Sequence, residues 1–146
     1  MRVCGVELHN NEAIVCLLSI DKDLFDLPDC RVRRVPLQSV NSREHLQTFQ
    51  FAFAKLMEDY KVEKVSIRER MMKGKYAGGA VGFKLEAAIQ LIEGLEVELL
   101  SPTIIKETLA RNPLPIHFND TGLKVFQETA FVCAYASLLK DKFQAI

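Results

Sequence analysis

Two neighbouring apolar segments open the chain, and segments of strand-like and helix-like spacing follow to its end. Residues 2–8 and 13–20 are dominated by Val, Leu, Ile and Cys. The His9-Asn10-Asn11 triplet between them suits a turn, because asparagine tolerates positive φ. The two segments are therefore predicted to pair as an antiparallel hairpin. A hairpin followed by alternating strands and helices favours a mixed sheet with helices on its faces over an all-helical bundle.

The rest of the chain is expected to add three strands and four helices. Pro36 places the third strand at an edge or at the end of its ladder, because proline cannot donate a backbone hydrogen bond. Ser101-Pro102 marks a helix start, with serine as the cap and proline at the first helical position. We expect a five-stranded sheet, and the apolar character of the first strand and of the strand that ends at Ile67 favours pairing between these two. In order, the predicted elements are a loop at 21–29, a strand at 31–37, a helix from residue 41 or 42 to about 60, a strand at 61–68, a helix at 82–93, a strand at 97–100, a helix at 102–110 and a last helix from Asp120 or Thr121.

A basic, glycine-rich stretch connects the fourth predicted strand to the helix that follows it. The 17 residues from 68 to 84 contain five cations and a single acid, Glu69; the cations are Arg68, Arg70, Lys73, Lys75 and Lys84. Such a stretch before a helix N-terminus is typical of a phosphate site, because backbone N–H groups and cationic side chains both favour an anion. A solvated loop without a ligand is the simpler alternative. We expect Arg70, Lys73 and Lys75 to be largely exposed, on the same face as the N-terminus of the following helix. Tyr76 within it is equally compatible with stacking on a base and with internal packing.

Composition limits the partners that the chain as a whole can attract. Lysine and arginine together number 19, as do aspartate and glutamate, so an anion site must rest on local clustering. The four cysteines lack Cys-x-x-Cys spacing, and we interpret them as reduced core residues of a cytoplasmic protein. We expect no secretory signal, because charge and strand pattern begin at once. No apolar run approaches the roughly 18 residues of a membrane span.

Four segments carry a resemblance to known families. They are Gly5-Val6-Glu7, Val65-Ser66-Ile67, the basic loop with the Ala-rich helix after it, and the segment from Leu100 to Lys106. The first resembles the Gly-Ile-Asp of RuvC-type Holliday-junction resolvases, and the last resembles their Pro-Thr-x-x-Lys helix start. End to end, the chain resembles a bacterial domain-of-unknown-function family of the ribonuclease H-like superfamily. The resemblance implies one ribonuclease H-like α/β domain over residues 1–146, a mixed five-stranded sheet with helices on both faces. Its strand order also implies that the first strand is central and pairs with the strand that ends at Ile67.

The resemblance also implies a nuclease site. Enzymes of this superfamily hold two divalent ions with three or four carboxylates, and the ions polarise the phosphate and activate water. The candidate catalytic residues are Glu7, Glu69 and Glu128. Of these, Glu7 and Glu128 would bind Mg²⁺ or Mn²⁺ if the site is active.

This chain departs from the superfamily pattern at two positions. Arg68 directly follows Ile67, where the resemblance implies the second carboxylate, and the last helix lacks its customary second acid after Glu128. A cation beside carboxylates opposes binding of a divalent metal ion. The departures favour a degenerate, inactive site in which Arg68 pairs with Glu7 and Glu128 pairs with Lys124 one turn back.

Two functions therefore remain open. The first is a nucleic-acid-associated protein that contacts DNA or RNA phosphates through the five cations of residues 68–84 and through Arg31, Arg33 and Arg34. The second is a small homo-oligomeric protein whose 68–84 loop binds a phosphorylated small molecule or a protein partner. The superfamily resemblance favours the first function. Binding measured at two salt concentrations separates the two, because polyanion binding falls steeply with salt.

Overall fold

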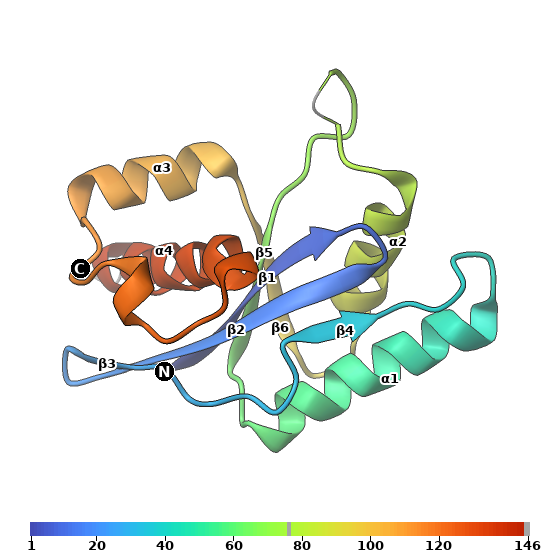
Figure 1. Cartoon of the computed structure of the whole chain (residues 1–146), viewed down its shortest axis with the longest axis horizontal. Helices are drawn as coiled ribbons and strands as arrows, with labels where there is room; N and C mark the ends of the chain where they lie inside the picture. The colour runs from blue at the N-terminus through green and yellow to red at the C-terminus, as the bar shows by residue number, and fades with distance from the viewer. Residues whose placement is uncertain (76, 145–146) are drawn as a thin grey trace.

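The computed structural model describes residues 1–75 and 77–144, apart from the side chains of residues 142–144. In this part of the chain, a six-stranded mixed sheet separates two helical layers (Figure 1). Its strands are β1 (Arg2–His9), β2 (Glu12–Asp21), β3 (Leu24–Asp26), β4 (Arg34–Pro36), β5 (Lys64–Arg68) and β6 (Glu96–Leu100). The helices are α1 (Arg43–Asp59), α2 (Ala80–Gln90), α3 (Pro102–Arg111) and α4 (Glu128–Gln144), with short 3-10 turns η1 (Phe118–Asp120) and η2 (Val125–Gln127).

The first strand, β1, lies at the centre of the sheet, as predicted. The strand order is β3-β2-β1-β5-β6, and β4 also pairs with β2. β1 runs antiparallel to β2, with Glu7 opposite Ile14, and parallel to β5, with Val6 opposite Ile67. Both neighbours of β1 are therefore the strands expected from the sequence.

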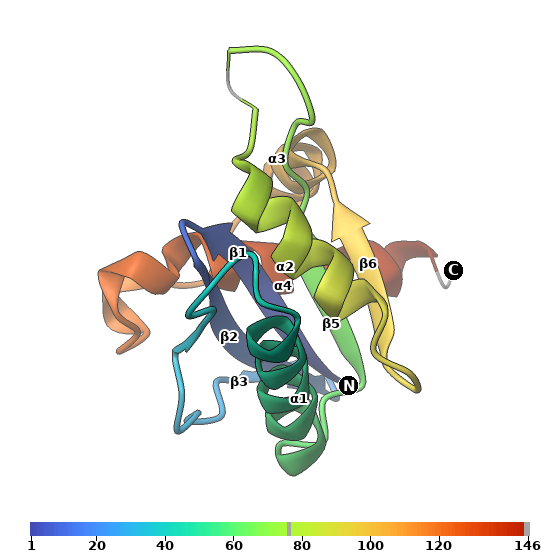
Figure 2. The same cartoon turned by 90° about the vertical axis from the view of Figure 1, so that its right-hand side faces the viewer.

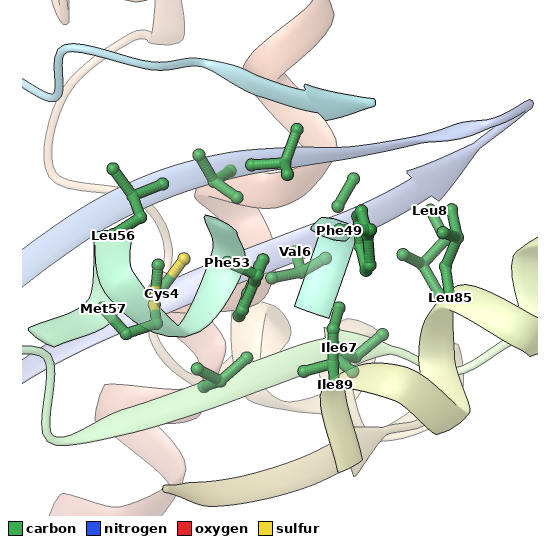
Figure 3. Packing of buried hydrophobic residues seen from close by; sticks show 14 of the residues in the cluster. Cys4, Val6, Leu8, Phe49, Phe53, Leu56, Met57, Ile67, Leu85 and Ile89 are labelled. Carbon is green, nitrogen blue, oxygen red and sulfur yellow. The ribbon is translucent and has the colours of Figure 1, made fainter. Parts of the chain in front are cut away.

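Helices α1 and α2 cover one face of the sheet and enclose the larger core (Figures 1 and 2). Figure 3 shows Val6 of β1 and Ile67 of β5 beneath Phe53 of α1 and Ile89 of α2. All four side chains are fully buried. Burial of a large apolar side chain contributes about 1.5–3 kcal/mol, so this layer is a main source of stability. It also holds the strands whose ends build the candidate site.

Helix α4 lies directly against the other face of the sheet, and α3 packs on α4. Gly5 permits this close approach. A β-carbon at residue 5 would lie 2.8 Å from the backbone nitrogen of Ala134, closer than packed atoms tolerate. Glu7 follows two residues later and so emerges on the same face of β1. The Gly5-Val6-Glu7 segment therefore sets both the depth of α4 and the direction of Glu7.

The sheet contains one strand more than the five predicted. The segment at 21–29, predicted to be a loop, contains β3, which pairs with the end of β2 at the sheet edge. The strand predicted at 31–37 shortens to β4, three residues that pair with the start of β2. Sequence periodicity missed β3 because all three of its residues are exposed, so no apolar alternation marks it.

The last helix begins later than the predicted start at residue 120 or 121. Residues before it form η1 and η2. The buried Gln127 side chain accepts a hydrogen bond from the backbone nitrogen of Lys124 and donates one to the carbonyl of Val15, each at 3.0 Å. A contact with β2 therefore delays the helix until Glu128, and local spacing could not predict that contact.

The helix starts predicted from capping residues are confirmed. The Ser42 hydroxyl accepts a hydrogen bond from the backbone nitrogen of His45 at 3.2 Å, and the Ser101 hydroxyl accepts one from Ile104 at 3.1 Å. All four cysteines are buried free thiols, which confirms them as core residues. In the part of the chain that the structure describes, no helix combines the length and apolar character needed to cross a bilayer.

Candidate functional site

The carboxyl ends of β1 and β5 lie side by side on the face of the sheet that α4 covers. Gly5 packs against α4, so Glu7 and His9, at intervals of two residues, share that face. In β5, the side chain of Ser66 also contacts Cys133 of α4, and Arg68, two residues later, therefore emerges on the same side. The parallel register of the two strands thus brings a carboxylate, an imidazole and a guanidinium to one end of the sheet.

A cavity of about 500 Å³ opens between these strand ends and the start of α4. Glu7 of β1, Arg68 of β5 and Glu128 of α4 all line it. His9 and Thr129 add polar groups to the wall. The fold therefore gathers three of the charged residues singled out in the sequence, from segments that are far apart along the chain.

The ion pairs predicted for these residues are not formed. Among the described residues, neither Arg68 with Glu7 nor Glu128 with Lys124 comes within the 4.0 Å of an ion pair. The side chains of Glu7, Arg68 and Glu128 have no hydrogen-bond partner among the described residues either. All three charged groups are therefore available to a ligand.

A second cavity of about 450 Å³ continues from the first, and the two share Glu7, His9 and Arg68. Glu69 lines only this second cavity, together with residues at the base of the basic loop. It is the residue after β5 ends, and its backbone nitrogen donates to the carbonyl of Leu100 at 2.9 Å. We call these two adjoining cavities together the β1/β5 groove; Arg68 is among the residues that line both.

Arg70 is half-buried, whereas the sequence predicted an exposed phosphate-binding cation. Its guanidinium donates a hydrogen bond to the carbonyl of Leu8. A β-carbon on Gly78 would lie 3.0 Å from the β- and δ-carbons of Arg70, so glycine makes room for this side chain. Burial raises the pKa of Glu86 on α2; the nearby Glu69 raises it further and Arg70 opposes both. Arg70 ties the end of β1 to the base of the basic loop, a structural role that the prediction missed.

The lysines of the basic loop differ in their surroundings. Lys73 and Lys75 are exposed, as predicted, on a segment that projects beyond the sheet (Figures 1 and 2). Lys84 on α2 is also exposed, but its amine donates a hydrogen bond to the carbonyl of Val40 at 2.9 Å. Tyr76 lies outside the described residues. The loop therefore presents Lys73 and Lys75 at the end of the sheet where the β1/β5 groove opens.

Arg31 and Arg33 precede β4 and Arg34 begins it, and two of these three arginines make internal contacts. Arg31 forms an ion pair of 2.7 Å with Asp59. Arg34 forms one of 3.3 Å with Glu12, and its guanidinium lies 3.8 Å from the centroid of the Phe126 ring. Phe126 lines the first cavity, so Arg34 supports the wall of the groove.

The chain matches one protein-family model and resembles solved structures in its fold. A family model described as a protein of unknown function (DUF3010) matches residues 1–137. The chain belongs to this family. The RuvC structure from Thermus thermophilus superposes with a TM-score of 0.75 at 13% identity, over 99% of this chain and 97% of that one. T. thermophilus RuvC in complex with a Holliday junction substrate gives 0.71 at 14% identity, over 98% and 96%. No curated protein sequence matches the chain. The ribonuclease H-like fold expected from the resemblance is confirmed.

The side chains at the groove form a limited set of metal donors. Among residues 1–75 and 77–144, no group of three or more His, Cys, Asp and Glu side chains is arranged to hold a metal ion. The first cavity offers the carboxylates of Glu7 and Glu128 and the imidazole of His9, with the Arg68 guanidinium beside them. Glu69 lies in the second cavity of the groove, so the first cavity by itself has fewer than the three or four carboxylates that hold two divalent ions.

Sequence reasoning missed several residues of the groove. It assigned His9 to a surface turn, although His9 ends β1 and lines both cavities. Side chains two residues apart on a strand point the same way, so the position of His9 two residues after Glu7 could have predicted that both lie on one face. Ile105, Val125 and Phe126 had no such signal, because α3 and η2 reach the groove only through tertiary packing.

Proposed function

We propose that this protein binds nucleic acid along the β1/β5 groove, with Arg68 on a backbone phosphate, and that it does not hydrolyse nucleic acid by a two-metal mechanism. The position of Arg68 carries the proposal. Arg68 lines both cavities of the groove, and its side chain has no partner among the described residues. A guanidinium presents paired N–H donors that match two phosphate oxygens.

The shape of the groove favours a polymer over an isolated phosphate. Its two cavities, of about 500 and 450 Å³, adjoin along the ends of β1 and β5, so the site is elongated. Lys73 and Lys75 extend the basic surface beyond it. RuvC, whose fold this chain shares, is seen with a Holliday junction substrate, which supports nucleic acid as the ligand class.

The charges in the groove argue against two-metal hydrolysis. Two divalent ions need several carboxylates, whereas Glu7 and Glu128 are the only carboxylates among the described residues that line the first cavity. Arg68 supplies positive charge from the protein itself and so competes with a metal ion. A bound strand would therefore be held and left intact.

The test is a binding titration of the wild-type protein at two salt concentrations. Labelled ligands are a four-way junction, a duplex and a single strand. We expect affinity for at least one of them to fall steeply with salt, because phosphate contacts release counterions. The Lys73→Ala/Lys75→Ala variant should bind more weakly, with a log–log slope reduced by about two units at most. The matched control, Lys22→Ala/Lys61→Ala, changes two exposed lysines at the opposite end of the sheet and should keep the wild-type slope.

Three outcomes would count against the proposal. An unchanged slope in Lys73→Ala/Lys75→Ala would favour the loop as a site for a phosphorylated small molecule or a protein partner. Absence of binding to all three polyanions would remove the nucleic-acid function. Strong Mg²⁺- or Mn²⁺-dependent cleavage by the wild type, abolished in Glu7→Gln, would identify a working nuclease.

A further inference from the structure

We infer that the first cavity of the β1/β5 groove holds one unpaired nucleobase of the bound nucleic acid, while Arg68 contacts the adjoining phosphate. This inference rests on the proposed function and specifies the ligand further. It assigns the end of the groove near η2 to the base, and it predicts a preference for nucleic acid with an unpaired nucleotide over a fully paired duplex.

The lining of the first cavity matches the two-sided chemistry of a base. A base has apolar faces and a polar edge, and half of the ten residues around this cavity are apolar while the rest are polar or charged. Its volume of about 500 Å³ lies within the usual range of small-molecule sites, about 300–1,000 Å³. The apolar residues are Ile14, Ile105, Val125, Phe126 and Val132.

Val125 is the most unusual of these apolar residues. The residue is 81% exposed although it borders the cavity. An exposed valine on the rim, next to the ring of Phe126, gives the flat face of a base an apolar surface to cover. Stacking and apolar contact of this kind are how proteins hold single bases without a paired strand.

The wall that carries Val125 and Phe126 is fastened to the sheet. The Arg34 guanidinium lies 3.8 Å from the Phe126 ring centroid, and Gln127 donates to the Val15 carbonyl at 3.0 Å. Both contacts join η2 to the β2/β4 part of the sheet. A wall held in place before binding loses little entropy when a ligand arrives, which favours binding at this end of the groove.

The two carboxylates give the cavity a preference among bases. Glu7 and Glu128 accept hydrogen bonds, and neither has a partner among the described residues. Cytosine, adenine and guanine carry an exocyclic amino group with two N–H bonds, enough to donate to both carboxylates, whereas an unpaired thymine offers a single donor, its N3–H. Cytosine should therefore bind better than thymine, a base of similar size.

The experiment compares four ligands built on one duplex, at a single salt concentration. They are the fully paired duplex and the same duplex with a bulged cytosine, a bulged thymine or a bulged abasic site. We expect the cytosine bulge to bind about five- to tenfold more tightly than the abasic bulge, with the thymine bulge between them. The abasic bulge controls for the flexibility that any bulge adds to the duplex.

A matched pair of variants assigns the difference to the cavity. Val125→Asp places a charge at the apolar rim and should abolish the preference for a bulged base over the abasic bulge. Leu91→Asp makes the same kind of change at a side chain that is 73% exposed on the α1/α2 side of the sheet, and it should keep that preference. Both positions are exposed, so both variants are expected to fold; circular dichroism checks this.

The outcomes distinguish this inference from the proposed function. Equal affinity for the cytosine, thymine and abasic bulges, with salt-dependent binding to all of them, would overturn the base pocket and leave nucleic-acid binding intact. Thymine bound as tightly as cytosine would overturn the role of the carboxylates. A preference that persists in Val125→Asp would place the base elsewhere. Absence of binding to all four ligands would overturn the proposed function and, with it, this inference.

Discussion

Lys64 and Arg68 occupy the two ends of β5 on the same face of the sheet, yet their surroundings are opposite. The Lys64 side chain is 2% exposed and pairs with Asp141 of α4 and, at 3.2 Å, with Glu98 of β6. Arg68 lies in an open groove and has no ion pair among the described residues. One strand thus carries a cation that is ion-paired within the protein and another that has no ion-pair partner among the described residues.

The Lys64 end shows what a structural charge cluster looks like in this fold. Glu98 accepts hydrogen bonds from Ser137 at 2.8 Å and from Lys140 at 3.1 Å. Burial alone would raise the pKa of Glu98, but these hydrogen bonds and the nearby Lys64 more than offset it and hold the pKa below its ordinary value. Residue type alone therefore does not identify a structural cation in β5, whereas the internal partners of Lys64 do.

The largest expected effect is on stability, and it contrasts the two ends of β5 directly. Lys64→Ala should lower the free energy of unfolding by about 2–4 kcal/mol, because it leaves the charges of Glu98 and Asp141 without their buried partner. Arg68→Ala should change it by only about 0.5 kcal/mol, because Arg68 has no ion-pair or hydrogen-bond partner to lose among the described residues. Urea denaturation of both variants measures this. Equal destabilisation would show that Arg68 is also a structural cation.

The next effect is on binding, and it should appear at the Arg68 end. Arg68→Gln should weaken nucleic-acid binding and reduce the salt slope by about one unit, the contribution of one phosphate contact. Arg43→Gln, at the exposed start of α1, serves as the matched control and should leave the slope unchanged. If both variants lost the same affinity, the effect would reflect overall charge and not the groove.

A smaller effect is expected on metal binding. Arg68→Glu removes the cation and adds a third carboxylate to the cavity that contains Glu7 and Glu128, which favours a divalent ion. Calorimetric titration with Mn²⁺ should show tighter binding to this variant than to the wild type. Arg68→Gln removes the cation without adding a ligand and should show little gain. Mn²⁺ binding of equal strength in all three proteins would contradict the assigned position of Arg68.

The smallest effect concerns acid stability at the Lys64 end. The folded-state pKa of Glu98 is lowered, so its contribution to stability is complete above the unfolded-state pKa and is lost as pH falls through the folded-state value. Glu98→Gln removes this contribution, and its unfolding free energy should therefore change less between neutral and acidic pH than that of the wild type. Urea midpoints at a series of pH values measure the difference. A steeper acid dependence in the variant would reverse the sign of the assigned shift.

Much of the fold could be predicted because the relevant signals are local. Apolar runs identified β1, β2 and β5, and the Ser101-Pro102 pair located the start of α3. The period of two along a strand also places Glu7 and His9 on one face and Lys64 and Arg68 on one face. Strand β3 and the late start of α4 escaped prediction, because exposed residues and a distant hydrogen bond determine them.

The sequence by itself determined which charged residues stand at the ends of the central strands. Only the tertiary structure decided which of these charged side chains have ion-pair partners within the protein. Lys64 meets Asp141, 77 residues away, because α4 docks across the sheet, while the same helix begins at Glu128 without closing over Arg68. Local spacing governs the direction of a side chain, but its partners depend on how distant elements pack. For that reason Lys64 is ion-paired within the protein, whereas Arg68, on the same face of the same strand, has no ion-pair partner among the described residues.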